Sequence, residues 1–235
     1  MKAIIKKELY SALHSPIFYG VAVFFLIFTS VWLFYLQRYF TLDSATLRPF
    51  FVAFPLAMIL AAPALTMKGW AEERKIGSVE LLLTLPASEW DLVLGKFLAT
   101  FSLLCIILAL TIPVPLTLSA LGDFDAGVIV GEYIGAVLLS ASAISLGLLL
   151  SALSKNQASA FLGSAIVLVV MILINQASAR LPAPFADFVN FFSLSFHFDS
   201  FSKGVIDTRD AAFFVLTTVL FLFLNVRVIL YRKWN

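Results

Sequence analysis

Charged residues are scarce in this chain. Only 13% of its 235 residues are charged, 61% are hydrophobic, and the mean hydropathy is +1.00. A soluble domain is about 25% charged and about 45–50% apolar. The composition therefore excludes an ordinary soluble domain and indicates an integral membrane protein. The formal net charge of +2 is too small to indicate a nucleic-acid partner.

Cysteine and histidine are almost missing. The single cysteine, Cys105, lies within an apolar run, so no disulfide or cysteine-based metal site forms within one chain. We expect a packed, inert thiol there. The two histidines, His14 and His197, are far apart and lack the spacing of metal ligands. The sequence predicts no metal site.

The sequence also lacks the usual phosphate cradle of a nucleotide-binding protein. No G-x-x-x-x-G-K-[ST] motif occurs, and the Gly95-Lys96 pair is followed by Phe97. We therefore expect this chain to bind no ATP or other cofactor. If it performs active transport, the energy comes from another polypeptide.

Ionisable side chains are rare inside the apolar runs, although pumps and proton-coupled transporters usually keep such groups at mid-membrane. We expect Lys96 and Arg227 to extend from near the ends of their runs to the membrane surface. Glu132 lies near the outer end of its run, and no serine has a plausible partner base. We predict no catalytic residues, and neither a membrane enzyme nor a transporter with its own proton relay.

Long apolar stretches are what the sequence has in abundance. A helix needs about 20 mostly apolar residues to cross the hydrocarbon core, and six stretches qualify. The first is too long for a signal peptide and has no cleavage site after it. The sequence predicts an all-α membrane protein, one transmembrane domain over 1–235, with spans at 17–38, 50–69, 90–114, 127–151, 158–175 and 210–230.

The distribution of lysine and arginine predicts the orientation of the chain. With the N-terminus in the cytoplasm, eleven of the sixteen basic residues lie on the cytoplasmic side. The five on the outer side are Arg38, Arg48, Arg180, Lys203 and Arg209. Cytoplasmic loops carry the excess of basic residues, and six spans return the chain to its starting side. We predict that both termini are cytoplasmic.

Two segments outside the spans have amphipathic patterns. In 1–15, Lys2, Lys6 and Lys7 would face the lipid headgroups, and Leu9 belongs to an apolar face. This pattern predicts an interfacial helix on the cytoplasmic surface.

The second segment, 176–209, has apolar residues at helical spacing. These are Phe185, Phe188, Val189 and Phe192, then Leu194, Phe198 and Phe201. We expect one or two short helices that lie in or dip into the outer membrane face. An apolar cap packed on the bundle is a compatible alternative.

Prolines and small residues mark the middle spans. Pro55, Pro63, Pro113 and Pro115 would kink spans two and three, either as hinges or as static bends. In span four, 131–135 reads GxxxG, and small residues recur at every fourth position from 143 to 151. We expect this face to pack within the chain.

The loop between spans two and three holds five of the fourteen acidic residues, counting to Asp91. Residues 71–76 are compatible with a short helix, Gly77 with a turn, and the following leucines with an apolar ridge that ends at Pro86. Ser88 and Asp91 have the spacing of a capping box that opens span three. Either the loop is an ordinary solvated connection, or its ridge fills a groove on a partner.

The stretch WAEERKIGSVELLLTLP at 70–86, followed by GKF at 95–97, resembles the signature of the type 2 permease family of ABC transporters. The resemblance extends over the whole chain. It is closest to the branch of gliding-motility and nitrous-oxide-reductase-maturation permeases. Ser78 stands where threonine is common in that family.

The resemblance implies that the loop at 70–88 is a coupling helix docked on a separately encoded ATPase, which binds ATP and magnesium. It implies two permease chains, identical or related, with two ATPases in a bacterial cytoplasmic (inner) membrane. The implied coupling residues are Trp70, Glu72, Glu73, Arg74, Gly77, Ser78, Glu80, Leu81, Leu82 and Pro86. The implied outer gate consists of Phe185, Phe188, Phe192 and Phe198.

Three functions remain open. The leading hypothesis is a subunit that exports a substrate with energy from the ATPase. A second is a mechanical subunit whose ATPase cycle drives a partner outside the cytoplasm. A third is a passive membrane scaffold. The 24 phenylalanines fit hydrophobic cargo and lipid-facing helices equally well, so they do not identify a substrate.

Overall fold

The computed structural model describes residues 1–41, 46–77, 88–178 and 182–233, and within these ranges the chain is helical without strands. Six of its helices are long and apolar enough to cross a membrane. This confirms the predicted all-α, six-span fold. The observed spans are Pro16–Leu36, Arg48–Ile76, Glu89–Ser119, Ala126–Leu153, Gln157–Gln176 and Thr208–Tyr231.

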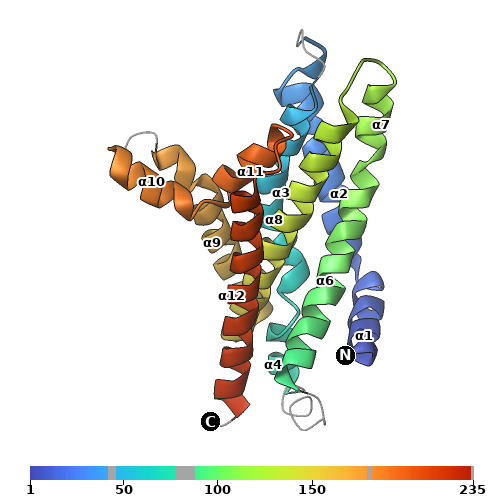
Figure 1. Cartoon of the computed structure of the whole chain (residues 1–235). Helices are drawn as coiled ribbons and strands as arrows, with labels where there is room; N and C mark the ends of the chain where they lie inside the picture. Colours follow the sequence, from blue (N-terminus) through green and yellow to red (C-terminus); the bar gives the residue numbers. More distant parts are fainter. Residues whose placement is uncertain (42–45, 78–87, 179–181, 234–235) are drawn as a thin grey trace.

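The helices follow one another along the chain in the order shown in Figure 1. Span one consists of α2 and a π-helical turn, span two contains α3 and α4, and span three contains α6 and α7. The bounds are α1 Lys2–Leu13, α2 Pro16–Val31, η1 Trp32–Leu36, η2 Tyr39–Thr41, α3 Arg48–Thr66, α4 Ala71–Ile76, α6 Glu89–Thr111, α7 Pro113–Ser119, α8 Ala126–Leu153, α9 Gln157–Ser178, α10 Ala183–Phe191, α11 Leu194–Ser202 and α12 Thr208–Lys233.

Helix α8 is the central element of the bundle and packs against α3, α6, α9, α11 and α12. Its small residues make this possible. A Cβ atom added at Gly147 would collide with the Thr66 side chain of α3, and one at Gly135 would collide with Phe201 of α11. Lipid tails are as apolar as the helices, so helices associate in membranes through such close packing. The prediction that this face packs within the chain is confirmed.

Aromatic side chains fill the space between α2, α3 and α8. The ring of Phe54 lies 5.3 Å from that of Phe25, and the ring of Phe51 lies 5.0 Å from that of Tyr133. Both are edge-to-face arrangements, which aromatic pairs favour. The Tyr133 hydroxyl is also 2.9 Å from the hydroxyl of Thr111, which joins α8 to α6.

The prolines occupy two kinds of position. Pro55 and Pro63 lie inside α3. Pro113 lies instead at the first positions of α7, just after α6 ends at Thr111. Proline is well suited to the start of a helix, because the N–H it lacks would have no partner there. The third span is thus two consecutive helices, and it extends to Ser119 rather than to 114.

Both chain termini lie at the same end of the bundle, together with α1 and α4 (Figure 1). An even number of spans requires this. The bias of lysine and arginine predicts that this end faces the cytoplasm. We call it the predicted cytoplasmic end, and the opposite end the predicted outer end.

The segment between spans five and six forms two short helices, as predicted, but they differ in their surroundings. In α11, Leu194, Phe198 and Phe201 are all buried against the bundle. Figure 1 shows that α10 instead extends away from the bundle beyond α9. The cap interpretation therefore describes α11, while α10 keeps an exposed aromatic face.

Candidate functional site

The start of α4 is attached to the end of α8 by a single hydroxyl group. The backbone N–H groups of Trp70 and Ala71 donate to Ser151 Oγ at 3.1 and 3.2 Å, and this hydroxyl donates to the Met67 carbonyl at 3.2 Å. The first N–H groups of a helix have no partner inside it. The Ser151 hydroxyl on the neighbouring span is the acceptor for these groups. Trp70 is buried against the same region, with 1% exposure.

The last turn of α4 is anchored in a similar way. The Arg74 guanidinium donates to the Ser154 carbonyl at the end of α8. Gly77 follows with a backbone φ of +76°, in the left-handed region. A helix often ends on glycine in this conformation, because other residues adopt it at a cost. The predicted turn at Gly77 is present.

An ion cluster joins α4 to α1 and α6. Lys96 Nζ lies 3.0 Å from Glu8 Oε1 and 2.9 Å from Glu73 Oε1. Lys7 Nζ lies 3.5 and 3.3 Å from the same two atoms. Two cations and two anions thus connect three helices through shared carboxylate oxygens. We call these four residues the ion cluster.

The position of Lys96 corrects the sequence-based expectation. Its side chain is 2% exposed, so it is enclosed by neighbouring helices rather than open to the lipid headgroups. A buried ammonium group is costly unless it is paired, and Glu8 and Glu73 provide the partners. Its Nζ also lies 4.9 Å from the centre of the Trp70 ring, within range of a cation–π contact.

Lys7 is the more exposed cation of the cluster. Burial by itself lowers the pKa of Lys7, but the neighbouring carboxylates of Glu8 and Glu73 outweigh this effect and raise the pKa above its ordinary value. The side chain therefore remains charged at neutral pH. Lys7 pairs with Glu73 of α4, and its side chain is still 61% exposed, so the expectation that it faces the lipid headgroups stays a prediction.

Helix α1 is closely packed on the bundle. A Cβ atom added at Gly95 of α6 would lie 2.8 Å from Ile4 Cγ2, so the two helices approach where Gly95 has no side chain. Leu9 packs half-buried against the core, while Lys2 and Lys6 are exposed. The helix predicted over 1–15 is present as Lys2–Leu13, and its polar face agrees for these two lysines.

The structure brings together the first half of the predicted coupling residues. Trp70, Glu72, Glu73 and Arg74 lie on or beside α4, and Gly77 ends it. The remaining ones lie outside the described residues: Ser78, Glu80, Leu81, Leu82 and Pro86. Span three begins as predicted, because the Asp91 N–H donates to Ser88 Oγ at 3.1 Å.

A groove of about 380 Å³ opens between α1, α6 and the junction of α3 with α4. Polar side chains line one part of it, and apolar side chains from the spans line the other. The polar part includes Ser11, Ser15, Lys68, Glu72 and the ion cluster, and the apolar part includes Ile17, Phe18, Leu65, Ala99 and Leu103.

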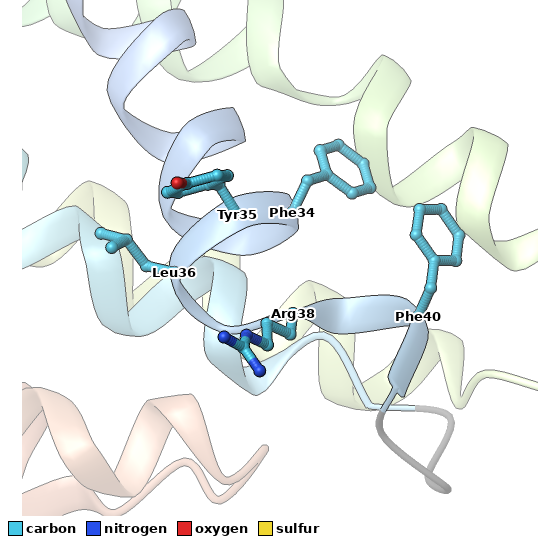
Figure 2. Close-up of a pocket in the computed structure, with 5 residues that line it drawn as sticks. All are labelled: Phe34, Tyr35, Leu36, Arg38 and Phe40. Carbon is cyan, nitrogen blue, oxygen red and sulfur yellow. The ribbon is translucent and has the colours of Figure 1, made fainter.

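A second, more open pocket lies at the predicted outer end of span one (Figure 2). It has a volume of about 480 Å³ and is lined by Phe34, Tyr35, Leu36, Arg38 and Phe40. All five side chains are exposed. Aromatic and basic residues of this kind are typical of the membrane–water interface. Within the described part of the chain, no group of histidine, cysteine and acidic residues is arranged to hold a metal ion.

The predicted gate residues do not form one cluster. Phe185, Phe188 and Phe192 are exposed on or next to α10, whereas Phe198 is buried in α11. The ring of Phe188 lies 5.3 Å from that of Phe192. Three of the four predicted gate residues thus share an exposed aromatic face at α10. The fourth, Phe198, lies apart from this face.

Charged residues at the predicted outer end hold α11 to α3. Arg48 Nη2 lies 2.8 Å from Asp199 Oδ1, and Lys203 pairs with the other oxygen of the same carboxylate. Burial raises the pKa of Asp199, but hydrogen bonds from Lys203 and Arg48 outweigh this and lower the pKa below its ordinary value. Nearby in α8, Glu132 is fully buried.

Sequence reasoning missed several of these contacts. Ser151 was part of the small-residue series and was interpreted as packing alone. The pairing of Lys96 had a usable signal, because a lysine within an apolar span requires a partner. Glu8 gave no signal, since an acidic residue near the start of a chain is usually solvated.

The comparisons with known proteins agree with this architecture. A search of curated proteins gives no match. The model of the ABC-2 family transporter protein matches residues 37–228, which include spans two to five, all of α4 and most of span six. Members of this family are membrane permease components of ABC transporters, distinct from the nucleotide-binding subunit, and normally work with an ABC ATPase. Because the match covers most of its length, this chain belongs to the ABC-2 family of transporter proteins.

Proposed function

We propose that this chain is the permease subunit of an ABC exporter in a bacterial cytoplasmic membrane. It couples ATP hydrolysis by a separate ATPase to export of a substrate. The working unit contains two permease chains and two ATPases, which hold the ATP and magnesium. One observation carries the proposal: α4 has ion pairs to α1 and α6 and a hydrogen-bonded attachment to α8.

These bonds provide a mechanical path from the loop into the bundle. A displacement of α4 acts on α8 through Ser151 and Ser154, and on α1 and α6 through Glu73. Helix α8 in turn contacts α3, α9, α11 and α12. Packed cores respond to such displacements by switching between discrete arrangements rather than by bending continuously.

The ATPase contact itself is assigned to the segment that follows α4. In this proposal Leu81 and Leu82 fill a groove on the ATPase, and Glu80 lies beside them. Gly77 permits the chain to turn into this segment. Apolar anchors in a groove are a common mode of peptide recognition.

Co-purification with an ATPase encoded beside this chain tests the assignment. We expect Leu82→Asp to abolish recovery of the ATPase, because a carboxylate in an apolar groove is costly. The matched control is Leu121→Asp, since Leu121 is 77% exposed and lies beyond α7, at the opposite end of the bundle. Full ATPase recovery with Leu82→Asp would contradict the docking role.

A mechanical subunit is the second candidate, and the exposed aromatic face of α10 favours it. Phe185 and Phe188 are 65% and 66% exposed, which fits contact with a partner outside the cytoplasm as well as a gate. Phe188→Ser distinguishes the two functions in reconstituted vesicles. Export by the wild-type chain that is lost with Phe188→Ser, in vesicles that contain no such partner, supports the gate. Absence of export by both chains in these vesicles supports the mechanical function.

A further inference from the structure

The groove between α1, α6 and the α3–α4 junction contains two charged residues that the ion cluster does not satisfy. Lys68 donates only a long hydrogen bond, 3.4 Å, to Ser15 Oγ. Glu72 has no hydrogen bond or ion pair with any residue in the described ranges. Both are half-buried and both line the groove. One cation and one anion therefore remain available to a ligand.

The groove is amphipathic in the way that a lipid headgroup site requires. Its polar side holds Lys68, Ser15 and Glu72, and its apolar side is formed by Phe18, Leu65 and Leu103 of three spans. Its volume of about 380 Å³ is at the lower end of the range for ligand pockets, about 300–1,000 Å³. Such a volume suits a headgroup, with the acyl chains extending along the apolar wall into the bilayer.

We propose that the groove binds a bilayer phospholipid with a primary-amine headgroup, of the phosphatidylethanolamine class. The phosphate accepts hydrogen bonds from Lys68 and Ser15, and the ammonium donates to Glu72. Helix α2 begins at Pro16 beside Ser15, and the N-terminus of a helix favours an anion. A purely anionic headgroup leaves Glu72 unpaired, and a quaternary ammonium offers it no N–H donor.

The bound lipid would also be placed to affect coupling. The groove is lined by α1 and by the first turn of α4, the two elements that the ion cluster joins. A headgroup held by Lys68 and Glu72 would stabilise the observed position of α4. This consequence rests on the proposed function, but the binding itself does not.

Native mass spectrometry of the delipidated full chain tests the proposal without any ATPase. Phosphatidylethanolamine, phosphatidylglycerol and phosphatidylcholine with the same acyl chains are added separately. We expect the first to bind about tenfold more tightly than the other two, because a hydrogen-bonded charge pair is gained. Equal binding of phosphatidylethanolamine and phosphatidylglycerol would overturn the proposal.

Four variants test which residue binds the phosphate of the headgroup and which binds its ammonium group. We expect Glu72→Gln to remove the preference for phosphatidylethanolamine over phosphatidylglycerol, and Lys68→Gln to weaken both lipids about tenfold. Lys68→Arg keeps the charge and should retain binding, which excludes a general loss of fold. Lys155→Gln removes an exposed lysine between α8 and α9 and should change nothing. A preference that survives Glu72→Gln would contradict the assigned ammonium partner.

Discussion

At the scale of single residues, Lys96 and Glu132 show two outcomes for an ionisable group inside a membrane bundle. Lys96 is buried but has two carboxylate partners within 3.0 Å. Glu132 is fully buried, and neither of its carboxyl oxygens has a hydrogen-bond partner in the part of the chain that the structure describes. Buried polar groups are usually satisfied, so the two residues should respond in opposite ways to replacement by an apolar side chain.

We expect Lys96→Met to lower the free energy of unfolding by at most about 3–5 kcal/mol, because it removes the buried cation of the ion cluster and leaves Glu8 and Glu73 with only the exposed Lys7 as partner. Thermal unfolding in detergent measures the change. Lys2→Met is the matched control, since Lys2 is exposed on α1, and it should have little effect. An equal loss in both variants would show that the ion cluster contributes no more than a surface lysine.

Glu132→Leu should instead raise the free energy of unfolding, by about 1–3 kcal/mol, because two buried oxygens without partners are replaced by an apolar side chain. The same thermal measurement applies. Glu132→Gln keeps an unpaired polar group and should remain close to the wild type. Destabilisation by leucine would mean that Glu132 has a partner in the working assembly.

At the scale of elements, close contacts at glycine positions set the distances between helices. Gly95 admits Ile4 of α1, and Gly147 admits Thr66 of α3. The second contact lies one helical turn before Ser151, which holds α4. The packing of α8 on α3 and the attachment of α4 are therefore parts of the same junction. A change in the packing at Gly147 should alter the attachment of α4 at Ser151.

Gly147→Ala should destabilise the bundle by about 1–3 kcal/mol, since the added Cβ collides with Thr66 and the core is closely packed. Gly163→Ala on α9 is the control, because nothing lies within 4 Å of an added Cβ there. That change should be neutral or stabilising, as alanine favours a helix. Comparison of the two unfolding midpoints gives the result; a harmless Gly147→Ala would contradict the close approach.

At the scale of the whole molecule, the bundle is polarised between its two ends. Both termini, α1, α4 and the ion cluster lie at the predicted cytoplasmic end, and α10 and α11 lie at the other (Figure 1). In the proposed function the ATPase acts near one end of α8, and α11 packs on α8 near the other end. The predicted orientation then puts α4 on the cytoplasmic side and the aromatic α10 on the outer side.

The orientation gives a prediction of its own. A reporter active only in the cytoplasm should function at either terminus, because the excess of lysine and arginine retains that end inside. The same reporter inserted at Gly122, between α7 and α8, should be inactive. An active insertion there and inactive terminal fusions would reverse the assignment of the two ends.

Much of the fold followed from the sequence, since long apolar runs and the positions of Gly77 and Ser88 are local signals. The helix spacing of Leu194, Phe198 and Phe201 likewise predicted α11. The different surroundings of α10 and α11 were not predictable, because both helices have an apolar face and only packing decides which face is covered.

The sequence alone determined the membrane class, the six spans, the charged loop and the family resemblance, because these depend on composition and short-range pattern. Tertiary structure alone decided that Lys96 is paired rather than exposed, that Ser151 holds α4, and that Lys68 and Glu72 share a groove. The partners of these residues come from helices distant in the chain. Their contacts depend on how α1, α3, α6 and α8 pack together, which no local pattern encodes.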